Sequence, residues 1–120
     1  MIDKISNLAI VREFWRAIAA RDVDAYLRLF AEGAVSHDPV NKPAQKTESE
    51  RRANMTAILG GFNSVTAALE YITACGDHTA NKWKLVGTTP DGTKVVIEGI
   101  DVIRHADDGR IAEIWGYFDN

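Results

Sequence analysis

The chain has 120 residues, of which 46% are hydrophobic and 26% are charged, and this composition is typical of one globular domain with its own hydrophobic core. A formal net charge of −3 at pH 7 argues against nucleic-acid binding through a basic surface. No apolar run is long enough to cross a membrane, and the single cysteine, Cys75, excludes an intrachain disulfide and a cysteine-based zinc cluster.

The first half of the chain carries three helical patterns. Apolar residues recur at three- and four-residue spacing over Ile5–Ala20, which predicts an amphipathic helix with one face on the core. A second, shorter helix is expected to follow and to end near Gly33, because glycine readily adopts the left-handed conformation of a C-terminal cap. Thr47 and Glu50 have the spacing of a capping box, which predicts a third helix that runs to about Leu59.

The second half changes to patterns typical of strands. Val65–Cys75 and Trp83–Thr88 are two such segments, and Lys94–Arg104 is followed after a turn by Ile111–Phe118. A short strand is also expected over Ala34–Pro39, among the helices. Three helices with one short strand among them, followed by a four-stranded antiparallel meander, predict an α+β fold. A strongly curved sheet around the helices would enclose a pocket.

An aspartate lies in the middle of the most regular strand pattern. Alternate side chains of a strand point to the same face, so Asp101 shares its face with apolar residues such as Ile97 and Ile103. A carboxylate in such a row is costly unless it is paired, hydrogen-bonded or protonated. The row therefore favours a buried acid with a partner or a use over an acid on the outer face that pairs with lysine or arginine.

The turn Ala106–Gly109 decides which residues face each other across the last two strands. A four-residue loop would place Asp101 opposite Ile114. The pocket face would then carry Gly99, Asp101, Ile103, Ala112, Ile114, Gly116 and Phe118. Trp115 and Tyr117 would lie on the other face, where aromatic side chains suggest a homodimer interface. A loop one residue longer would reverse the two faces.

Several segments of the chain share motifs with one known group of proteins. They are Val11–Trp15, Arg21–Tyr26, Phe30–Val40, Asp91–Gly92, Glu98–Arg104 and Asp108–Phe118. Together they resemble the SnoaL-like and ketosteroid isomerase-like group of the NTF2-like superfamily. The resemblance implies a single domain over residues 1–120, in which three N-terminal helices pack in a strongly curved, mainly antiparallel sheet around an apolar pocket. This cone is a cystatin-like α+β roll. Isomerases, cyclases, dehydratases, epoxide hydrolases and non-enzymatic binders share it, so the fold does not decide the function.

The resemblance also implies site residues. Laid over steroid Δ-isomerases, Asp38 falls on the general base and Asp101 on the protonated acid that stabilises the enolate oxygen. That family is a known example of carboxyl pKa values tuned by their surroundings. Its oxyanion-hole tyrosine falls on Phe14, which has no hydroxyl. The predicted substrate-binding residues are Phe14, Phe30, Met55, Trp83, Gly99, Ile114 and Phe118.

Two carboxyl groups in one apolar pocket can divide proton transfer between them if their surroundings differ. Asp38 is expected near a polar loop mouth, where it would stay ionised and act as the base, although a turn acid before a proline also fits it. Burial would keep Asp101 protonated and able to donate. This predicts double-bond isomerisation on a hydrophobic carbonyl compound such as a steroid. The alternatives are a SnoaL-like polyketide cyclase and a non-catalytic binder of small hydrophobic ligands, which Phe14 favours.

No cofactor or metal site is predicted. His37, His78 and His105 lack the helical i, i+4 spacing of zinc ligands, and the glycines form no phosphate loop. His37 is expected at the surface or the pocket rim, and the other two at solvated strand ends. The predicted partners are a small hydrophobic molecule and a second copy of the chain, without nucleic acid or membrane. The first residues lack the features of a signal peptide, which predicts a cytoplasmic location.

Overall fold

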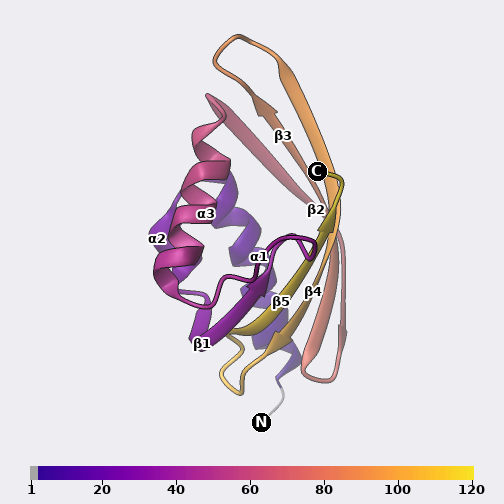
Figure 1. The fold of residues 1–120 in the computed structure, drawn as a ribbon. Helices are drawn as coiled ribbons and strands as arrows, with labels where there is room; N and C mark the ends of the chain where they lie inside the picture. Colours follow the sequence, from indigo (N-terminus) through magenta and orange to yellow (C-terminus); the bar gives the residue numbers. More distant parts are fainter. Residues whose placement is uncertain (1–2) are drawn as a thin grey trace.

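The computed structural model describes residues 3–120, which form three helices on one side of a five-stranded sheet (Figure 1). The helices are α1 (Lys4–Ala19), α2 (Val23–Leu27) and α3 (Glu48–Gly60). The strands are β1 (Phe30–His37), β2 (Ser64–Cys75), β3 (His78–Thr88), β4 (Lys94–His105) and β5 (Ile111–Phe118). Their order is β1–β5–β4–β3–β2, in which β1 is parallel to β5 and the other neighbours are antiparallel. The predicted α+β class is confirmed.

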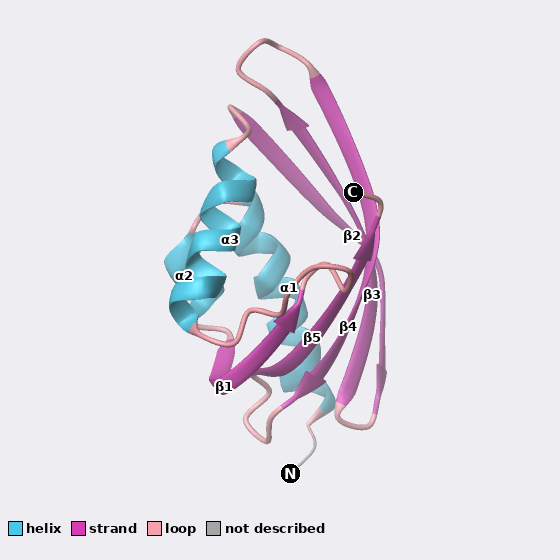
Figure 2. Ribbon diagram, in the orientation of Figure 1, coloured by secondary structure: helices cyan, strands magenta, loops and turns pink. Residues whose placement is uncertain are grey.

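The helices cover one face of the sheet, and the core lies between these two layers (Figure 2). The hairpin between β3 and β4 projects beyond the end of α3. Fully buried side chains include Phe14 and Tyr26 from the helices and Ile103, Ile111 and Ile114 from the sheet. Within residues 3–120, no helix has the length and apolar character that a membrane crossing requires. The cytoplasmic location stays a prediction.

The predicted capping box at the start of α3 is present. The Glu50 N–H donates to Thr47 Oγ1 at 3.1 Å, and the Thr47 N–H donates to Glu50 Oε1 at 3.1 Å. These bonds satisfy backbone donors that have no partner inside the first turn of a helix. The local sequence therefore fixes where α3 begins.

The prediction that the second helix ends near Gly33 was wrong. α2 ends at Leu27, and Gly33 lies inside β1 with a φ of +75°. β1 pairs with β5 at Phe30 and again from Val35, with an irregular register between them. Glycine adopts a positive φ without steric cost, so it suits a break in the ladder as well as a helix end.

β3 begins at His78, after a tight turn that contains Gly76, rather than at Trp83 as predicted. The additional residues place Thr79 and Asn81 on the face that meets the helices, where both are buried. Asparagine is disfavoured in strands, which explains why this part of the pattern did not indicate one.

The β4–β5 register differs by two residues from the predicted one. Asp101 pairs with Gly116 instead of Ile114. The pair that closes the turn is His105 with Ile111, which shifts the register by one residue relative to a four-residue loop. A bulge between Arg104 and His105 shifts it by a second residue. A shift of two residues preserves the alternation of side chains, so Asp101 still faces the helices.

His105 was expected to be solvated, but it is buried at the β4–β5 turn. Its Nδ1 and Nε2 lie 2.7 Å from Gly109 O and from Thr79 Oγ1, respectively. A carbonyl oxygen only accepts, so Nδ1 carries the proton and Nε2 accepts from the Thr79 hydroxyl. Burial lowers the pKa of His105, and the neutral ring ties the turn to β3. His78, by contrast, is partly exposed and pairs with Asp77.

Candidate active site

A cavity of about 490 Å³ lies between the helices and the sheet, a size that suits a small organic ligand. Its wall is mostly apolar and includes two carboxyl groups, those of Asp38 and Asp101. The apolar wall consists of Phe14, Trp15, Ile18, Pro39, Pro43, Met55, Ile58, Trp83, Leu85, Ile97 and Phe118. Lys42, Gln45 and Asn54 complete the lining.

The predicted substrate-binding residues divide into two groups. Those that line the cavity are Phe14, Met55, Trp83 and Phe118. Phe30 instead packs against Tyr26, with ring centroids 5.0 Å apart, and beneath the Arg51 guanidinium. Ile114 is fully buried in the core, and Gly99 supports a neighbouring side chain.

The two carboxyl groups meet above Gly116. Asp38 directly follows β1, and Asp101 in β4 pairs with Gly116 in β5. A Cβ atom placed on Gly116 would lie 2.3 Å from Asp38 Oδ1 and 3.2 Å from Asp101 Oδ1. The first of these distances is closer than real Cβ atoms approach other atoms. The missing side chain at this position therefore lets two acids from distant parts of the sequence share one space.

The two acids differ in burial and therefore in pKa. Asp38 is 9% exposed and Asp101 is 2% exposed. Asp38 begins the loop after β1, where it is more buried than expected. Burial raises the pKa of Asp38 to about 6. Burial and the nearby Asp38 charge raise the pKa of Asp101 well above its ordinary value, and a hydrogen bond from Trp83 opposes this only in part. In this order, Asp38 ionises first and Asp101 keeps its proton to a higher pH.

Trp83 holds Asp101 from the adjacent strand. Its Nε1 donates to Asp101 Oδ1 at 3.1 Å. The ring crosses β4 at Gly99, where an added Cβ would lie 2.4 Å from Trp83 Cζ2. Gly99 was predicted to bind substrate, and in the structure it makes room for this indole. Trp15 packs against the same indole with a centroid distance of 4.9 Å, and its Nε1 donates to Asn81 Oδ1 at 3.0 Å.

Two residues beside the two acids, Tyr26 and Asn81, were not predicted to belong to the site, and the role of Gly116 was not predicted. Tyr26 is buried against Phe14, with ring centroids 5.3 Å apart, and burial together with the charges of Asp38 and Asp101 raises its pKa. Tyr26 fits an apolar helical pattern, and such a pattern does not indicate a role for its hydroxyl. Asn81 lies two residues before Trp83 and so on the same face, a signal that a longer predicted strand would have revealed. Gly116 was placed on the pocket face, but nothing in the sequence indicates that two acids would lie over it.

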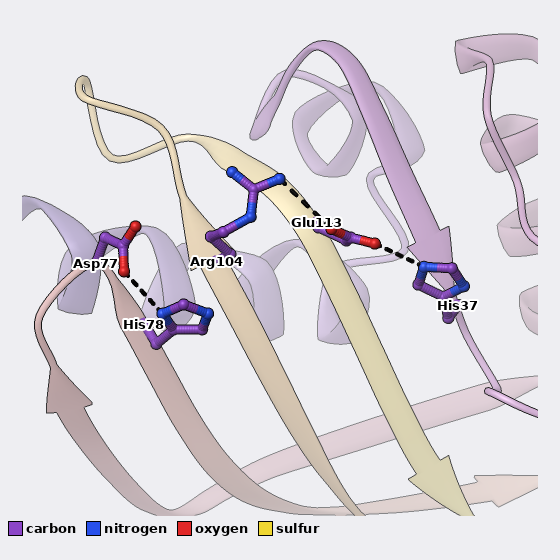
Figure 3. Close-up of polar contacts among 5 residues, drawn as sticks. All are labelled: His37, Asp77, His78, Arg104 and Glu113. Carbon is purple, nitrogen blue, oxygen red and sulfur yellow. Dashed lines mark hydrogen bonds and ion pairs between the residues drawn. The ribbon is translucent and has the colours of Figure 1, made fainter.

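His37 lies beside Asp38 in sequence but belongs to a polar group on the opposite face of the sheet (Figure 3). Its Nε2 is 2.8 Å from Glu113 Oε2, and Arg104 Nη2 donates to Glu113 Oε1 at 3.4 Å. The imidazole also stacks on Trp115. Neighbours along a strand point to opposite faces, so an inward Asp38 requires an outward His37.

The polar groups of the cavity suit proton transfer. Across residues 3–120, no three His, Cys, Asp or Glu side chains are grouped closely enough to hold a metal ion. The carboxyl pair combines an acid that ionises readily with one that keeps its proton to a higher pH, and both are buried beside a mostly apolar wall.

Comparisons with known proteins agree with this architecture. Residues 11–114 match the sequence model of the SnoaL-like domain. SalBIII, described as an epoxide hydrolase/cyclase-like enzyme in pyran ring formation in the polyether salinomycin, has a TM-score of 0.87 and 25% identity over 98% of this chain and 93% of that chain. A candidate SnoaL-like polyketide cyclase from Jannaschia sp. CCS1 has a TM-score of 0.83 and 20% identity, over 96% of this chain and 86% of that chain. An NTF2-like protein from Exiguobacterium sp. 255-15 has a TM-score of 0.77 and 17% identity, over 92% of this chain and 98% of that chain. These similarities confirm the predicted NTF2-like fold. No curated protein sequence matches the chain.

The order of ionisation can be measured by carboxyl-carbon NMR. We expect Asp38 to lose its proton first, with an apparent pKa of about 6, and Asp101 to remain protonated until a higher pH, because burial acts on both acids and the Asp38 charge then acts on Asp101. Asp38→Asn should lower the pKa of Asp101, since it removes that charge. Titration of both acids near pH 4, the ordinary value for aspartate, would contradict the arrangement.

The role of Gly99 can be tested by adding a single methyl group. Gly99→Ala should push the Trp83 indole away from Asp101 and cost about 1–3 kcal/mol in the free energy of unfolding, as overpacking typically does. Gly60→Ala is the matched control, because nothing lies within 4 Å of the added Cβ at the end of α3. Urea denaturation measures both variants. Equal stabilities would mean that the indole does not depend on Gly99.

Proposed function

Because this chain belongs to the SnoaL-like family, we propose that it is an enzyme that transfers protons on a small hydrophobic, oxygen-containing compound. Asp38 is the base and Asp101 is the acid. One observation carries the proposal: two buried carboxyl groups meet above Gly116 in an apolar cavity and differ in how readily they ionise. Paired acids whose surroundings separate their pKa values are typical of acid–base sites.

Ring closure is the reaction that this pair supports best. A hydroxyl of the substrate gives its proton to Asp38, and its oxygen forms a bond to an electrophilic carbon of the same molecule. The bond from that carbon to its leaving oxygen breaks, and the leaving oxygen takes the proton of Asp101. One proton then passes from Asp38 to Asp101, which restores the starting state. The similarity to SalBIII and to a candidate polyketide cyclase supports a polyketide-like substrate.

Double-bond isomerisation of a steroid-like ketone is the second candidate. The positions of Asp38 and Asp101 favour it, because a base and an acid in one apolar cavity can move an α-proton and stabilise the enolate oxygen. Phe14 weighs against it, since the ring lines the cavity where a hydroxyl donor would serve that oxygen. Ring closure needs only the two carboxyl groups, so we place it first.

Substitution of each acid tests the proposal. Asp38→Asn and Asp101→Asn should each lower kcat by about 100- to 10,000-fold, the usual contribution of a positioned base or acid. The substrates to test are a hydrophobic hydroxy-epoxide of the polyketide type and a 5-ene-3-ketosteroid. Asp24→Asn, which changes an exposed acid on α2, is the matched control and should leave kcat unchanged.

The pH dependence supplies a second readout. The rate should rise as Asp38 loses its proton near pH 6 and fall again at the higher pH where Asp101 ionises. A natural protein that binds both compounds without turnover, with equal affinity in the Asp38→Asn and Asp101→Asn variants, would instead establish a non-catalytic binder.

Phe14→Tyr separates the two reactions. The substitution adds a hydroxyl on the cavity wall, and gaining one oxyanion donor should raise 5-ene-3-ketosteroid turnover by about 100- to 1,000-fold. Ring closure of the hydroxy-epoxide should change little, because it uses only the two acids. Stopped-flow absorbance measures the steroid reaction. An unchanged steroid rate in a stably folded variant would remove isomerisation as a candidate.

We also propose that the protein is a homodimer joined through the outer face of the sheet. Ile100 and Tyr117 pair across β4 and β5, and each is about half exposed. Trp115 lies on the same face of β5, beside His37. A second copy of the chain would cover this apolar surface.

Sedimentation velocity tests the dimer. At micromolar concentration, the natural protein should sediment with twice the chain mass of 13.2 kDa. Ile100→Lys should yield a monomer, because it buries an unpaired charge in the interface. Ile5→Lys is the control, since Ile5 is 80% exposed on α1, away from this face. A monomeric natural protein would rule out the interface.

A further inference from the structure

Two indole rings hold two neighbouring polar side chains inside the molecule. Trp83 Nε1 donates to Asp101 Oδ1 at 3.1 Å, and Trp15 Nε1 donates to Asn81 Oδ1 at 3.0 Å. The two rings pack with centroids 4.9 Å apart. Asn81 in β3 pairs directly with Asp101 in β4. Paired residues of antiparallel strands have Cβ atoms about 4.5–5.5 Å apart on the same face, so the Asn81 amide is the cross-strand neighbour of the Asp101 carboxyl.

Trp15 fixes the orientation of this amide. An indole N–H only donates, so the Asn81 atom that faces it must be the carbonyl oxygen, and Nδ2 must occupy the other branch. Asn81 is 1% exposed, and its Nδ2 is buried and makes no hydrogen bond with any residue of the described range 3–120. A buried donor without an acceptor is costly. The fold thus keeps a donor without an acceptor beside the more deeply buried of the two acids.

When Asp101 gives up its proton, it can accept more hydrogen bonds. The carboxylate that forms has two accepting oxygens, and Trp83 serves one of them. Two other titratable groups interact electrostatically with Asp101: Asp38, which has just gained a proton at this stage, and the buried Tyr26, whose raised pKa keeps it neutral. Neither brings a positive charge to the new anion. Asn81, the cross-strand partner of Asp101, has an N–H without an acceptor.

We propose that Asn81 is a positioning residue for Asp101, whose carboxylate accepts a hydrogen bond from Asn81 Nδ2 once the acid has given its proton to the substrate. A neutral amide suits this task better than lysine or arginine. A cation at this position would keep Asp101 ionised at all times, whereas an amide leaves the acid protonated at rest and stabilises it afterwards. The inference rests on the proposed role of Asp101 as the acid.

Carboxyl-carbon NMR titration of Asp101 in the substrate-free protein tests the contact. Asn81→Leu keeps the approximate shape without the donor, and it should raise the pKa of Asp101 by about one to two units, the value of one hydrogen bond to a charged group. Asn81→Ala should give a rise of the same sign and guards against poor folding of the leucine variant. Trp15→Phe should give a smaller rise, because the amide keeps its donor and loses only its fixed orientation. Asn63→Leu, at an exposed asparagine before β2, is the matched control and should leave this pKa unchanged.

Kinetics give a second readout with the hydroxy-epoxide. Asn81→Leu should lower kcat by about 10- to 100-fold, which corresponds to a rise of one to two units in the pKa of Asp101. The high-pH limb of the rate profile should move to higher pH. A purely structural role for Asn81 would not move that limb. An unchanged or lowered Asp101 pKa in both Asn81→Leu and Asn81→Ala would overturn the inference. Because the titration needs no substrate, a raised pKa without turnover in the natural protein would refute the proposed function and leave the contact established.

Discussion

Two buried carboxyl groups share one small space above Gly116, and the chemistry of the site depends on this crowding. Like charges at close range in an apolar cavity repel strongly, so both acids cannot ionise at modest cost. One of the two acids therefore keeps its proton to a higher pH than the other. The protein obtains an acid and a base from two residues of the same type, and the difference between them comes from the deeper burial of Asp101 and from the charge of Asp38 beside it. Asp101 is the deeper of the two, and Trp83 fixes its orientation.

The site is carried mainly by the sheet and by α1. Gly99 and Gly116 lack side chains on the inward face, and larger groups lie over each of them: an indole over the first and the carboxyl pair over the second. The chain after Asp38 is tied to β5 by a hydrogen bond from the Val40 N–H to Gly116 O at 3.0 Å. Groups held by strands and a helix keep their geometry better than groups on free loops, which is what proton transfer over short distances requires.

The sequence was sufficient for the fold class and for the inward position of Asp101, because a strand repeats every two residues and a register error of two residues changes no face. Details that depend on local irregularity were not accessible. Gly33 fits a helix cap as well as a break in a strand, and the polar start of β3 concealed Asn81. Tyr26 followed an apolar helical pattern that says nothing about its hydroxyl. Which aromatic residues line the cavity and which fill the core depends on how the helices settle on the sheet, as Phe30 illustrates.

The depth of Asp38 also bears on the stability of the protein. Burial raises its pKa from 3.8 in the unfolded chain to about 6 in the fold, a difference worth about 3 kcal/mol. The folded state holds the proton at pH values where the unfolded chain releases it, so the stability from this group is full below about pH 4 and is lost as the pH rises through about 6. Asp101 acts in the same direction and over a range that extends to higher pH. The fold is thus strained electrostatically at the pH where Asp38 can accept a proton, and an asparagine at position 38 would give a more stable protein without its base.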